Sequence, residues 1–494
     1  MCLSGTRVAL LEDIWKWIQA ADHTKSAEIF LLSDLAGTGK SAIAHTVANR
    51  CHDASFLASS FFFDRDIPER SGPQKLFSTI TRDLSAWSKE FSERVSLVLE
   101  SDPSVASASP SRQFRQLILE PSGLYRSEKP VVIVIDALDE GYDPELLEIL
   151  CKEIPKLPGS FRIFLTSRPE DHIVTELSNS AHVRPRSIDI HGAINQTDIA
   201  LYCENRLRYI ASRKRLGAHW PGPHLSTEFQ KKAEGLFIWV STISEYLSRP
   251  KTFNPDGKLK SFLSDRNPSG LSAEAKMDEL YSKILENCDW DDREFVEMYQ
   301  LIVGSIMALK TPLSISALQS LHGDPALRIS EILRSLSSLF TGLSEERQPV
   351  RIIHLSFRDF VTCRARSAPK FERLYVDRKT HNQWLAFLCL SILNKGLNDD
   401  IPGIDYLTKE TPGINGIPTI ADEYVSEGLW YACRFWSEHL VKVENPISNE
   451  FLTALRNFFS TKLVRWIEVL NSKGQFQGLC NVREWLRVSV FALT

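Results

Sequence analysis

The sequence has no C-x-x-C pair, although it contains nine cysteines. They are scattered along the chain, at positions such as Cys51, Cys151, Cys288 and Cys433, and their number is odd. Structural zinc sites and the disulfide frameworks of secreted proteins need paired, regularly spaced cysteines. Neither is therefore expected, and this cysteine usage predicts a protein of the reducing cytoplasm.

Long hydrophobic runs are also missing. The longest, Val131–Ile135 and Leu301–Leu309, are far shorter than the roughly 20 apolar residues that span a bilayer. The first residues do not show the basic segment followed by an apolar one that marks a secretory signal. We therefore expect neither a signal peptide nor a membrane partner.

Charge of one sign is not in excess, because 58 Lys and Arg stand against 62 Asp and Glu, for a net charge of −4. Such a balance gives no general attraction to nucleic acid. A basic cluster between Arg206 and Arg215 is more typical of a solvated helix face, so nucleic acid is an unlikely partner. The sequence also lacks the G-x-S-x-G motif of serine hydrolases and any repeat of roughly 33 to 45 residues.

What the chain does have is length and apolar content. Its 494 residues are 43% hydrophobic and 24% charged, which is enough to bury several cores. About three domains are expected from the length alone. The sequence therefore predicts a multidomain globular protein.

The most informative stretch is Asp34–Ser41, which reads D-L-A-G-T-G-K-S. It follows the apolar run Ile29–Leu32 and precedes the helix-like run Ala42–Ala48, so the local order is strand, glycine loop, helix. This is the context of a P-loop, where backbone N–H groups and the positive end of the helix hold the β- and γ-phosphates. A chance match in a loop is the alternative, and the flanking strand and helix argue against it.

Each part of this loop has a predicted role. Gly37 and Gly39 let the backbone turn with its N–H groups inward, Lys40 adds a mobile cation, and the Ser41 hydroxyl is placed to bind Mg²⁺. Asp34 replaces the first glycine of the motif, and its carboxylate would repel a triphosphate unless it points away. The predicted nucleotide-binding residues of the loop are Ala36, Gly37, Thr38, Gly39, Lys40, Ser41 and Ala42.

A second chemical segment is the aliphatic run Val131–Ile135 with the acids that follow it. The run predicts a strand covered on both faces, and its carboxyl end is where ligands bind in open α/β sheets. We interpret it as a Walker B segment, in which Asp136 holds Mg²⁺ opposite Ser41. Asp139 or Glu140 would orient or deprotonate the water that attacks the γ-phosphate. The alternative is that these acids only cap the next helix.

A third strand is predicted at Phe161–Leu165, with Arg168 shortly after it. A guanidinium at this edge of the sheet could sense the γ-phosphate, whereas a structural ion pair is the alternative role for Arg168. Further strands are expected at Phe56–Phe63 and Ser187–His191. Together these segments predict an α/β P-loop NTPase fold with a parallel sheet and helices on both faces.

These motifs resemble those of a NACHT domain: the Asp34–Ser41 loop, the acidic segment Asp136–Glu140 and Thr166–Pro169. Two flanking segments, Cys2–Arg7 and Gly235–Val240, resemble the fungal branch of that family. The resemblance covers nearly the whole chain. It implies a signal-transduction ATPase related to NOD-like receptors, with an ADP-bound resting state and an ATP-bound assembling state. Neither the N-terminal effector domain nor the C-terminal repeats that are usual in the family can be recognised.

The resemblance and the downstream patterns predict five segments. Later in the sequence the order is helix, helix, strand, which is the order of a winged helix. The helix-like runs are Thr311–Leu321 and Pro325–Phe340, and the strand is Val350–His354. In the family this module closes over the nucleotide. The predicted segments are a lead-in helix (1–25), a P-loop NTPase (NACHT) core (26–200), a helical subdomain (201–300), a winged-helix-like module (301–365) and an α-helical arm (366–494).

Within that module, the segment His354–Phe360 resembles one that recurs in fungal members of the family. The resemblance implies that His354 approaches the diphosphate in the closed form and belongs to the nucleotide-binding residues. An imidazole can donate a hydrogen bond to a phosphate oxygen. The alternative is a histidine that is satisfied locally between a strand and a helix.

Other helices are predicted from periodicity alone. One packing helix is expected after Pro223, with Ser226 as its N-cap and apolar residues on one face as far as Leu247. Residues 250 to 270 are rich in Pro and Gly and predict a loop-rich boundary. From Lys379 onward the aromatic residues predict the core of an α-helical arm, which a long loop at Ile401–Ile420 interrupts.

The sequence is consistent with three functional hypotheses. The first is a slow nucleotide-operated switch of the NACHT type, which binds ATP or ADP with Mg²⁺, self-associates through the NTPase domain and acts on an unidentified protein effector. ATP and GTP both remain open as its nucleotide. The second is a P-loop enzyme, such as a kinase, with a separate substrate. The third is a non-catalytic P-loop scaffold, which Asp34 makes conceivable.

Overall fold

The computed structural model describes residues 1–22, 24–65, 67–123, 129–217, 219–249, 252, 254–264, 271–286, 288–324, 326–408, 418–444, 447–475 and 478–490. The chain forms two compact units, Met1–Lys276 and Met277–Thr494, and each is described by itself. The described residues contain no helix that is both long and apolar enough to cross a bilayer.

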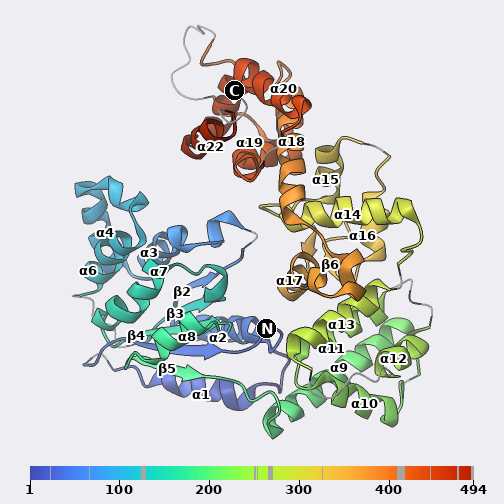
Figure 1. Ribbon diagram of the computed structural model, residues 1–494. Helices are drawn as coiled ribbons and strands as arrows, with labels where there is room; N and C mark the ends of the chain where they lie inside the picture. Colours follow the sequence, from blue (N-terminus) through green and yellow to red (C-terminus); the bar gives the residue numbers. More distant parts are fainter. Residues whose placement is uncertain are drawn as a thin grey trace. The chain divides into compact units, whose positions relative to one another are not determined.

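The first unit begins with an α/β sheet and ends in helices (Figure 1). Its elements are α1 (Val8–Gln19), β1 (Glu28–Ser33), α2 (Lys40–Asp53), β2 (Leu57–Phe62), α3 (Leu76–Trp87), α4 (Lys89–Ser101), α5 (Pro110–Gln113), α6 (Glu120–Ser122), β3 (Val131–Asp136), α7 (Pro144–Glu148), β4 (Phe161–Ser167), α8 (Asp171–Ser178), β5 (Val183–Arg186), α9 (Ala193–Lys214), α10 (Pro223–Ala233), α11 (Phe237–Ser248) and α12 (Pro255–Ser264).

The sheet is parallel, with strand order β2-β3-β4-β1-β5. Side chains alternate between its faces, as a strand requires. Phe30 and Phe164 pack with α1 and α2 on one face, while Leu31 and Leu165 pack with α3, α4, α7 and α8 on the other. The predicted parallel P-loop sheet with helices on both faces is therefore confirmed.

The fifth strand is not where the sequence predicted it. The expected strand Ser187–His191 is a loop, and β5 (Val183–Arg186) lies just before it, at the edge of the sheet beside β1. An edge position tolerates Pro185, which has no N–H to donate. In the loop, the Ile188 N–H donates to Asp34 and the Ile190 carbonyl accepts from Asn195, so side chains use these backbone groups instead of a neighbouring strand.

Two helical predictions for this unit were wrong. The single helix expected after Pro223 is two helices, α10 and α11, because Gly235 has φ +81° and a Cβ there would lie 2.3 Å from the Ile190 carbonyl oxygen. Ser226 is not an N-cap, since its hydroxyl donates to the Gly222 carbonyl. The predicted loop at 250–270 contains α12, whereas residues 250, 251, 253 and 265–270 lie outside the described residues.

The second unit is mainly helical. Its elements are α13 (Ala273–Leu285, from Met277 onward), α14 (Arg293–Ala308), α15 (Ile315–His322), α16 (Ile329–Ser335), β6 (Phe340–Thr341), β7 (Arg351–Ile352), α17 (Leu355–Thr362), α18 (Arg378–Gly396), α19 (Glu427–Leu440), α20 (Asn449–Asn457), α21 (Leu463–Ser472) and α22 (Cys480–Val490).

The expected order helix, helix, strand occurs here as α15, α16 and the antiparallel pair β6 and β7. The second helix is shorter than predicted: it ends at Ser335, and Phe340 belongs to β6 instead. Pro325, the predicted start of that helix, lies outside the described residues. The interpretation of 301–365 as a winged-helix-like module stays a prediction.

The C-terminal aromatic residues form a core, as predicted. Trp436 and Trp466 are buried at edge-to-face geometry with ring centroids 5.7 Å apart, whereas Trp384 is 40% exposed. Residues 409–417 of the expected loop Ile401–Ile420 lie outside the described residues. Its first part is held by the buried Glu468 carboxylate, which accepts from the backbone N–H groups of Asp405 and Leu407.

Candidate functional site

The glycine loop lies between β1 and α2, as the sequence predicted. Gly37 and Gly39 have φ +85° and +94°, a left-handed backbone that glycine adopts without strain. Gly39 directly precedes Lys40, the first residue of α2. The loop therefore presents its backbone at the N-terminus of a helix, where N–H groups and the helix dipole favour an anion.

Gly37 also lies against the helical part of the same unit. A Cβ at Gly37 would come within 2.1 Å of a side-chain carbon of Ile238, and the Ile238 N–H donates to the Gly37 carbonyl at 3.3 Å. Ile238 belongs to α11. A side chain at this position would thus force the loop and α11 apart.

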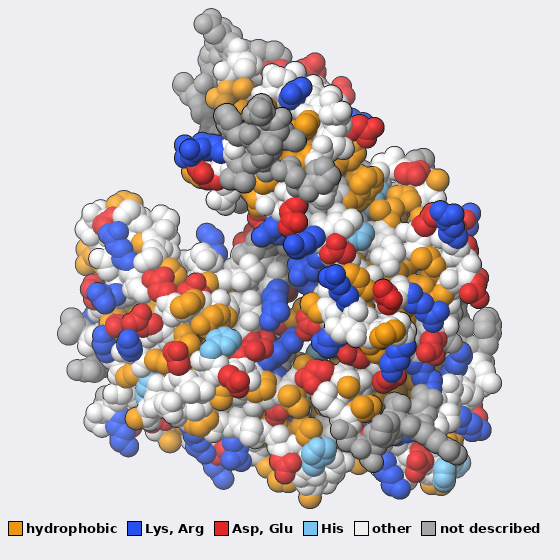
Figure 2. Space-filling view, in the orientation of Figure 1, with side chains coloured by type: hydrophobic (Ala, Val, Ile, Leu, Met, Phe, Trp, Pro, Cys, Tyr) orange, Lys and Arg blue, Asp and Glu red, His pale blue; other side chains and the backbone are white. Residues whose placement is uncertain are grey.

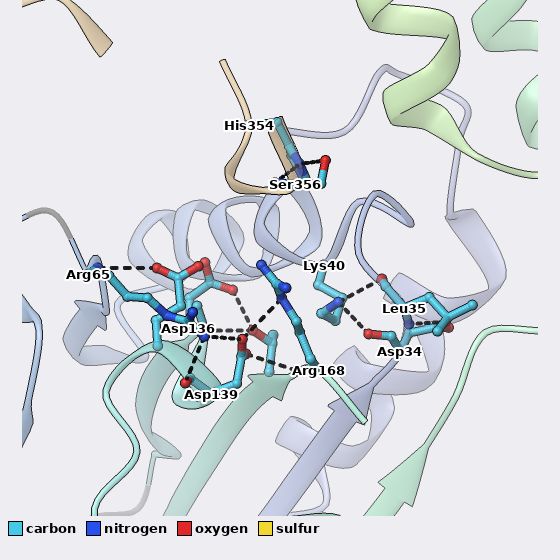
Figure 3. A network of polar contacts seen from close by, with 12 residues as sticks. Asp34, Leu35, Lys40, Arg65, Asp136, Asp139, Arg168, His354 and Ser356 are labelled. Carbon is cyan, nitrogen blue, oxygen red and sulfur yellow. Dashed lines mark hydrogen bonds and ion pairs between the residues drawn. The ribbon is translucent and has the colours of Figure 1, made fainter. Parts of the chain in front are cut away.

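The Lys40 ammonium is turned onto its own loop (Figure 3). It donates to the carbonyl oxygens of Asp34 at 2.6 Å and Leu35 at 2.9 Å. Burial lowers the pKa of Lys40, while the negative charges of Asp139 and Asp34 raise it. An ammonium has three N–H donors, so the Lys40 ammonium can donate to phosphate oxygens in place of these carbonyl oxygens while it stays at the loop.

The Asp34 carboxylate is held by two backbone N–H groups. Its Oδ1 accepts from the Leu35 N–H at 2.6 Å and its Oδ2 from the Ile188 N–H at 2.8 Å. Burial raises the pKa of Asp34, and these two hydrogen bonds counteract that rise. The residue that replaces the first glycine therefore ties the loop to the segment after β5.

The predicted magnesium ligands are neighbours. Asp136 ends β3 and Ser41 is the second residue of α2, and the Ser41 side chain lowers the pKa of Asp136 against the larger raising effect of burial. The Thr166 hydroxyl donates to Asp136 Oδ1 at 2.5 Å and accepts from the Ala137 N–H at 2.9 Å. β4 thus fixes the carboxylate at the end of β3.

Asp139 lies between two arginines (Figure 3). Its Oδ2 is 3.2 Å from Arg168 Nε and 3.7 Å from an Arg65 nitrogen, and the Arg168 backbone N–H donates to Oδ1 at 2.9 Å. The carboxylate is deeply buried, and Oδ2 has no well-aligned hydrogen bond among the described residues. Arg168 therefore forms the structural ion pair that was one of its two predicted roles. The contact of Arg168 with the γ-phosphate stays a prediction.

The next acid, Glu140, has a shifted pKa. Burial and the neighbouring Asp139 carboxylate raise the pKa of Glu140 from 4.5 to about 7, while Arg65 acts in the opposite direction. The Arg65 backbone N–H lies 3.4 Å from its carboxylate. A carboxylate that titrates near neutral pH is suited to general acid–base work.

Two arginines of the site were missed in the sequence. Arg65 follows β2, and its place after a strand of the parallel sheet could have indicated it. Arg7 precedes the sheet, and no local pattern indicates that it donates to the Thr38 carbonyl at 2.9 Å. Arg7 also reaches Asp198 of α9 and stacks on Phe237 of α11, 4.7 Å from the ring centroid.

The structure thus brings the loop residues, Asp136, Asp139, Glu140 and Arg168 to one edge of the sheet. His354 belongs to the second unit, where it precedes α17. There it is satisfied locally, because its Nδ1 accepts from the Ser356 N–H at 3.1 Å. Its proposed contact with a diphosphate stays a prediction.

Comparison with known proteins gives one family match. Residues 5–168 match the family model described as "Nephrocystin 3, N-terminal", a range that contains the loop, the acidic segment and Arg168. No curated protein matches the chain.

Three solved Drosophila structures show only distant similarity. A chain of "Structure of Drosophila ORC bound to DNA" is 13% identical, covers 72% of this chain and 94% of its own, and has a TM-score of 0.32. A chain of ORC bound to poly(dA/dT) DNA and Cdc6 is 14% identical over 97% of this chain and 68% of that one, with a TM-score of 0.27. A third, ORC bound to GC-rich DNA and Cdc6, is 12% identical over 97% and 69%, with a TM-score of 0.26. Scores of this size establish no shared assembly or ligand, so the chain is described by its P-loop fold and by its match to the nephrocystin 3 N-terminal model.

Proposed function

We propose that this protein is a nucleotide-operated signalling switch of the NACHT type, in fungal immunity-like signalling. It binds ATP or ADP with Mg²⁺ at the glycine loop and hydrolyses ATP slowly. The nucleotide state then sets domain opening and self-association through the NTPase domain. The observation that carries the proposal is the meeting of Ser41 and Asp136 beside Lys40, at the carboxyl edge of a parallel sheet.

The donor set fits a nucleotide and its metal. Ser41 and Asp136 offer the oxygen ligands that Mg²⁺ prefers, and Asp139 Oδ2 is a buried oxygen without a well-aligned hydrogen bond among the described residues. The N–H groups of the loop and the Lys40 ammonium would hold the phosphates. A bound Mg²⁺ would supply charge neutralisation at the transferred phosphoryl group.

The acids and arginines at this edge of the sheet have separate proposed roles in ATP hydrolysis. Glu140, with its pKa of about 7, can accept a proton from the attacking water when it is deprotonated. Asp139 holds Arg168 and Arg65 in place, so its charge orients two cations near the developing negative charge. Slow hydrolysis is expected because Asp139 is already paired with Arg168 and Arg65 and is not available as a second base.

The link from nucleotide to conformation is supported by contacts within the first unit. The loop touches α11 through Gly37 and Ile238, and Arg7 joins the Thr38 carbonyl to α9 and α11. A shift of the loop on phosphate binding would therefore change its contacts with α9 and α11. A winged-helix-like module at 301–365, with His354, would supply the opposing contact that favours ADP and closure.

One observation favours a second candidate, the non-catalytic scaffold. The Lys40 ammonium already donates to the carbonyl oxygens of Asp34 and Leu35 in its own loop, so it has hydrogen-bond partners without a phosphate. In that case the tie from Asp34 to Ile188 would be purely structural. Nothing in the described residues favours the kinase-like alternative over these two.

The test is to identify nucleotide that purifies with the protein. Wild-type protein is denatured, and the released nucleotide is identified by ion-exchange chromatography and mass spectrometry. We expect ADP in the wild type and in the Lys152→Ala control, an exposed lysine paired with Glu148, and none in Lys40→Ala. Light scattering should then show larger assemblies with ATP than with ADP. Protein that carries no nucleotide and binds neither ATP nor ADP would establish the scaffold instead.

A further inference from the structure

Helix α2 carries a histidine one turn after Ser41, the proposed magnesium ligand. His45 lies four residues beyond Ser41, so the two side chains share one face of the helix. Helical side chains lean toward the N-terminus of their helix, which directs the imidazole back toward Ser41. His45 is exposed and makes no hydrogen bond to another described residue. Its ring nitrogens are therefore available to a ligand.

The imidazole is oriented by a stacked aromatic ring. His45 and Phe62 lie nearly parallel, at an interplanar angle of 11° and with ring centroids 4.2 Å apart. Phe62 ends β2, and the sheet pairs it with Asp136, which ends β3. A stack covers the face of an imidazole and leaves its nitrogens uncovered, because they lie on the rim of the ring. The stack thus holds these nitrogens near the carboxyl ends of β2 and β3.

The Asp136 carboxylate has different neighbours on its two sides. β3 runs between β2 and β4, so Asp136 has Thr166 of β4 on one side and Phe62 of β2 on the other. Burial raises the pKa of Asp136, and a charge on His45 is among the effects that lower it, so the imidazole is within electrostatic reach of the carboxylate. An ion bound to Asp136 on the side of β2 would therefore meet an imidazole nitrogen.

An imidazole ligand changes which metal ions a site prefers. Mg²⁺ prefers oxygen ligands and keeps several of its waters, whereas imidazole nitrogen suits transition-metal ions. The described residues contain no group of three or more His, Cys, Asp or Glu side chains that could hold a metal ion by themselves. An ion at Asp136 and His45 would therefore take its remaining ligands from the Ser41 hydroxyl, from water and from phosphate.

The surface around the site offers a cation no general attraction. On the face shown in Figure 2, acidic and basic side chains are interspersed over the sheet and helices of the first unit. The net charge of the whole chain is only −4. A broad negative surface would bind divalent cations without specific ligands, whereas here the affinity depends on individual ligands. The loss of one ligand is therefore measurable.

We propose that His45 is a further metal ligand beside Ser41 and Asp136, and that its imidazole gives this site a preference for transition-metal ions over Mg²⁺. This role rests on the proposed function, which supplies Ser41 and Asp136 as the metal position. If His45 only covers Phe62 by stacking, the site has no such preference, and a bound ion has no nitrogen ligand.

The first test compares Co²⁺ with Mg²⁺ by titration calorimetry of the full-length protein, with and without ADP, at about pH 8, where imidazole is mostly neutral. His45→Phe keeps an aromatic ring for the stack and removes both nitrogens. We expect this variant to lose about tenfold or more in Co²⁺ affinity and to keep its Mg²⁺ affinity within about twofold. The matched control is His52→Phe, another exposed histidine of α2, which should bind both ions as wild type does. Equal Co²⁺ affinities in His45→Phe and wild type would overturn the proposal.

Pulsed EPR of bound Mn²⁺ observes the ligand itself. An imidazole nitrogen bonded to Mn²⁺ gives a ¹⁴N coupling, which oxygen ligands and water do not. We expect this coupling in wild type and in His52→Phe, and its absence in His45→Phe. Asp136→Asn should lose most of the bound Mn²⁺, because it removes the carboxylate at the proposed metal position. Wild-type protein that binds no Mn²⁺, or binds it without a nitrogen coupling, would contradict the role of His45 as a ligand.

A second pair of variants tests the stack. Phe62→Leu removes the ring that orients His45, so it should lower the Co²⁺ affinity, but by less than His45→Phe does. Phe56→Leu is the matched control, because Phe56 stacks on Trp15 of α1, with ring centroids 5.7 Å apart. An unchanged Co²⁺ affinity in Phe62→Leu would show that Phe62 does not position the imidazole.

ADP binding measured in the presence of Mg²⁺ separates this role from the proposed function. If ADP binds and the bound Mn²⁺ has no nitrogen coupling, His45 is not a ligand and the nucleotide switch stands. If Mn²⁺ has the coupling and neither ADP nor ATP binds, the proposed function fails and the metal site stands.

Discussion

Arg168 holds Asp139 by two separate groups: its backbone N–H donates to Oδ1 at 2.9 Å, and its Nε lies 3.2 Å from Oδ2. Arg65 approaches the same carboxylate from the segment after β2. The Asp139 carboxylate therefore orients two cations, and Glu140 is the better candidate for the base that accepts a proton from the attacking water. This geometry makes the roles of the three acids separable.

We predict that Asp136→Ala loses the Mg²⁺-dependent part of ATP affinity, because Asp136 meets Ser41 at the proposed metal position. Asp139→Ala and Glu140→Gln should lose hydrolysis by about 10²-fold or more and keep most of the ATP affinity. Titration with and without Mg²⁺ and a phosphate-release assay measure the two effects. Equal loss of ATP affinity in all three variants would remove this division of roles.

The pKa of Glu140 predicts a pH dependence of stability. Folding raises this pKa from 4.5 to about 7, so the folded state binds the proton more tightly than the unfolded state. The favourable contribution of protonated Glu140 is complete below about pH 4.5 and is lost as the pH rises through about 7. Glu140→Gln stays neutral, so it should raise the free energy of unfolding by about 1 to 3 kcal/mol at pH 8 and change it little at pH 4.5.

Thermal unfolding at the two pH values checks this prediction. The control is Glu148→Gln, an exposed carboxylate with a side chain that is 62% accessible, which should not raise the Tm at pH 8. A Tm for Glu140→Gln that equals the wild-type value at pH 8 would show that Glu140 is not shifted.

Asp34→Gly restores the usual first glycine of a P-loop, and we predict that it does not improve binding. The change removes the acceptors for the Leu35 and Ile188 N–H groups, which should lower the free energy of unfolding by about 1 to 3 kcal/mol. ADP affinity should stay equal or fall, because both carboxylate oxygens are already held by backbone N–H groups. Tighter ADP binding together with an unchanged Tm would show that Asp34 does repel phosphate.

The sequence was sufficient for the central part of this fold because its signals are local. The aliphatic run before Asp136 and the glycines before Lys40 specify strand and turn by themselves, and both were predicted within a few residues. The sequence was insufficient where the local structure depends on contacts with residues far away in the chain. β5 is a polar edge strand, and the loop after it is set by Asp34, 154 residues earlier. The contacts of Arg7 with Thr38 and Asp198 are equally non-local.

Arg7 gives a prediction for the coupling of the loop to the helices. Arg7→Ala should weaken ADP binding by about 1 to 2 kcal/mol, because the Thr38 carbonyl, Asp198 and Phe237 all lose a partner. The matched control is Arg50→Ala, which removes an arginine that stacks on Trp15 and pairs with Glu12. Titration of ADP measures both. Equal losses in the two variants would mean that Arg7 acts only on general stability.

We expect the glycine loop to bind nucleotide through Lys40, and titration calorimetry of ATP and ADP measures this binding. Lys40→Ala removes the cation that is bonded to the Asp34 and Leu35 carbonyls and leaves the backbone of the loop in place. We predict a loss of about 2 kcal/mol or more, roughly thirtyfold in affinity, with binding by Lys152→Ala equal to wild type. ATP binding by Lys40→Ala that equals wild type would show that the loop does not bind nucleotide through Lys40.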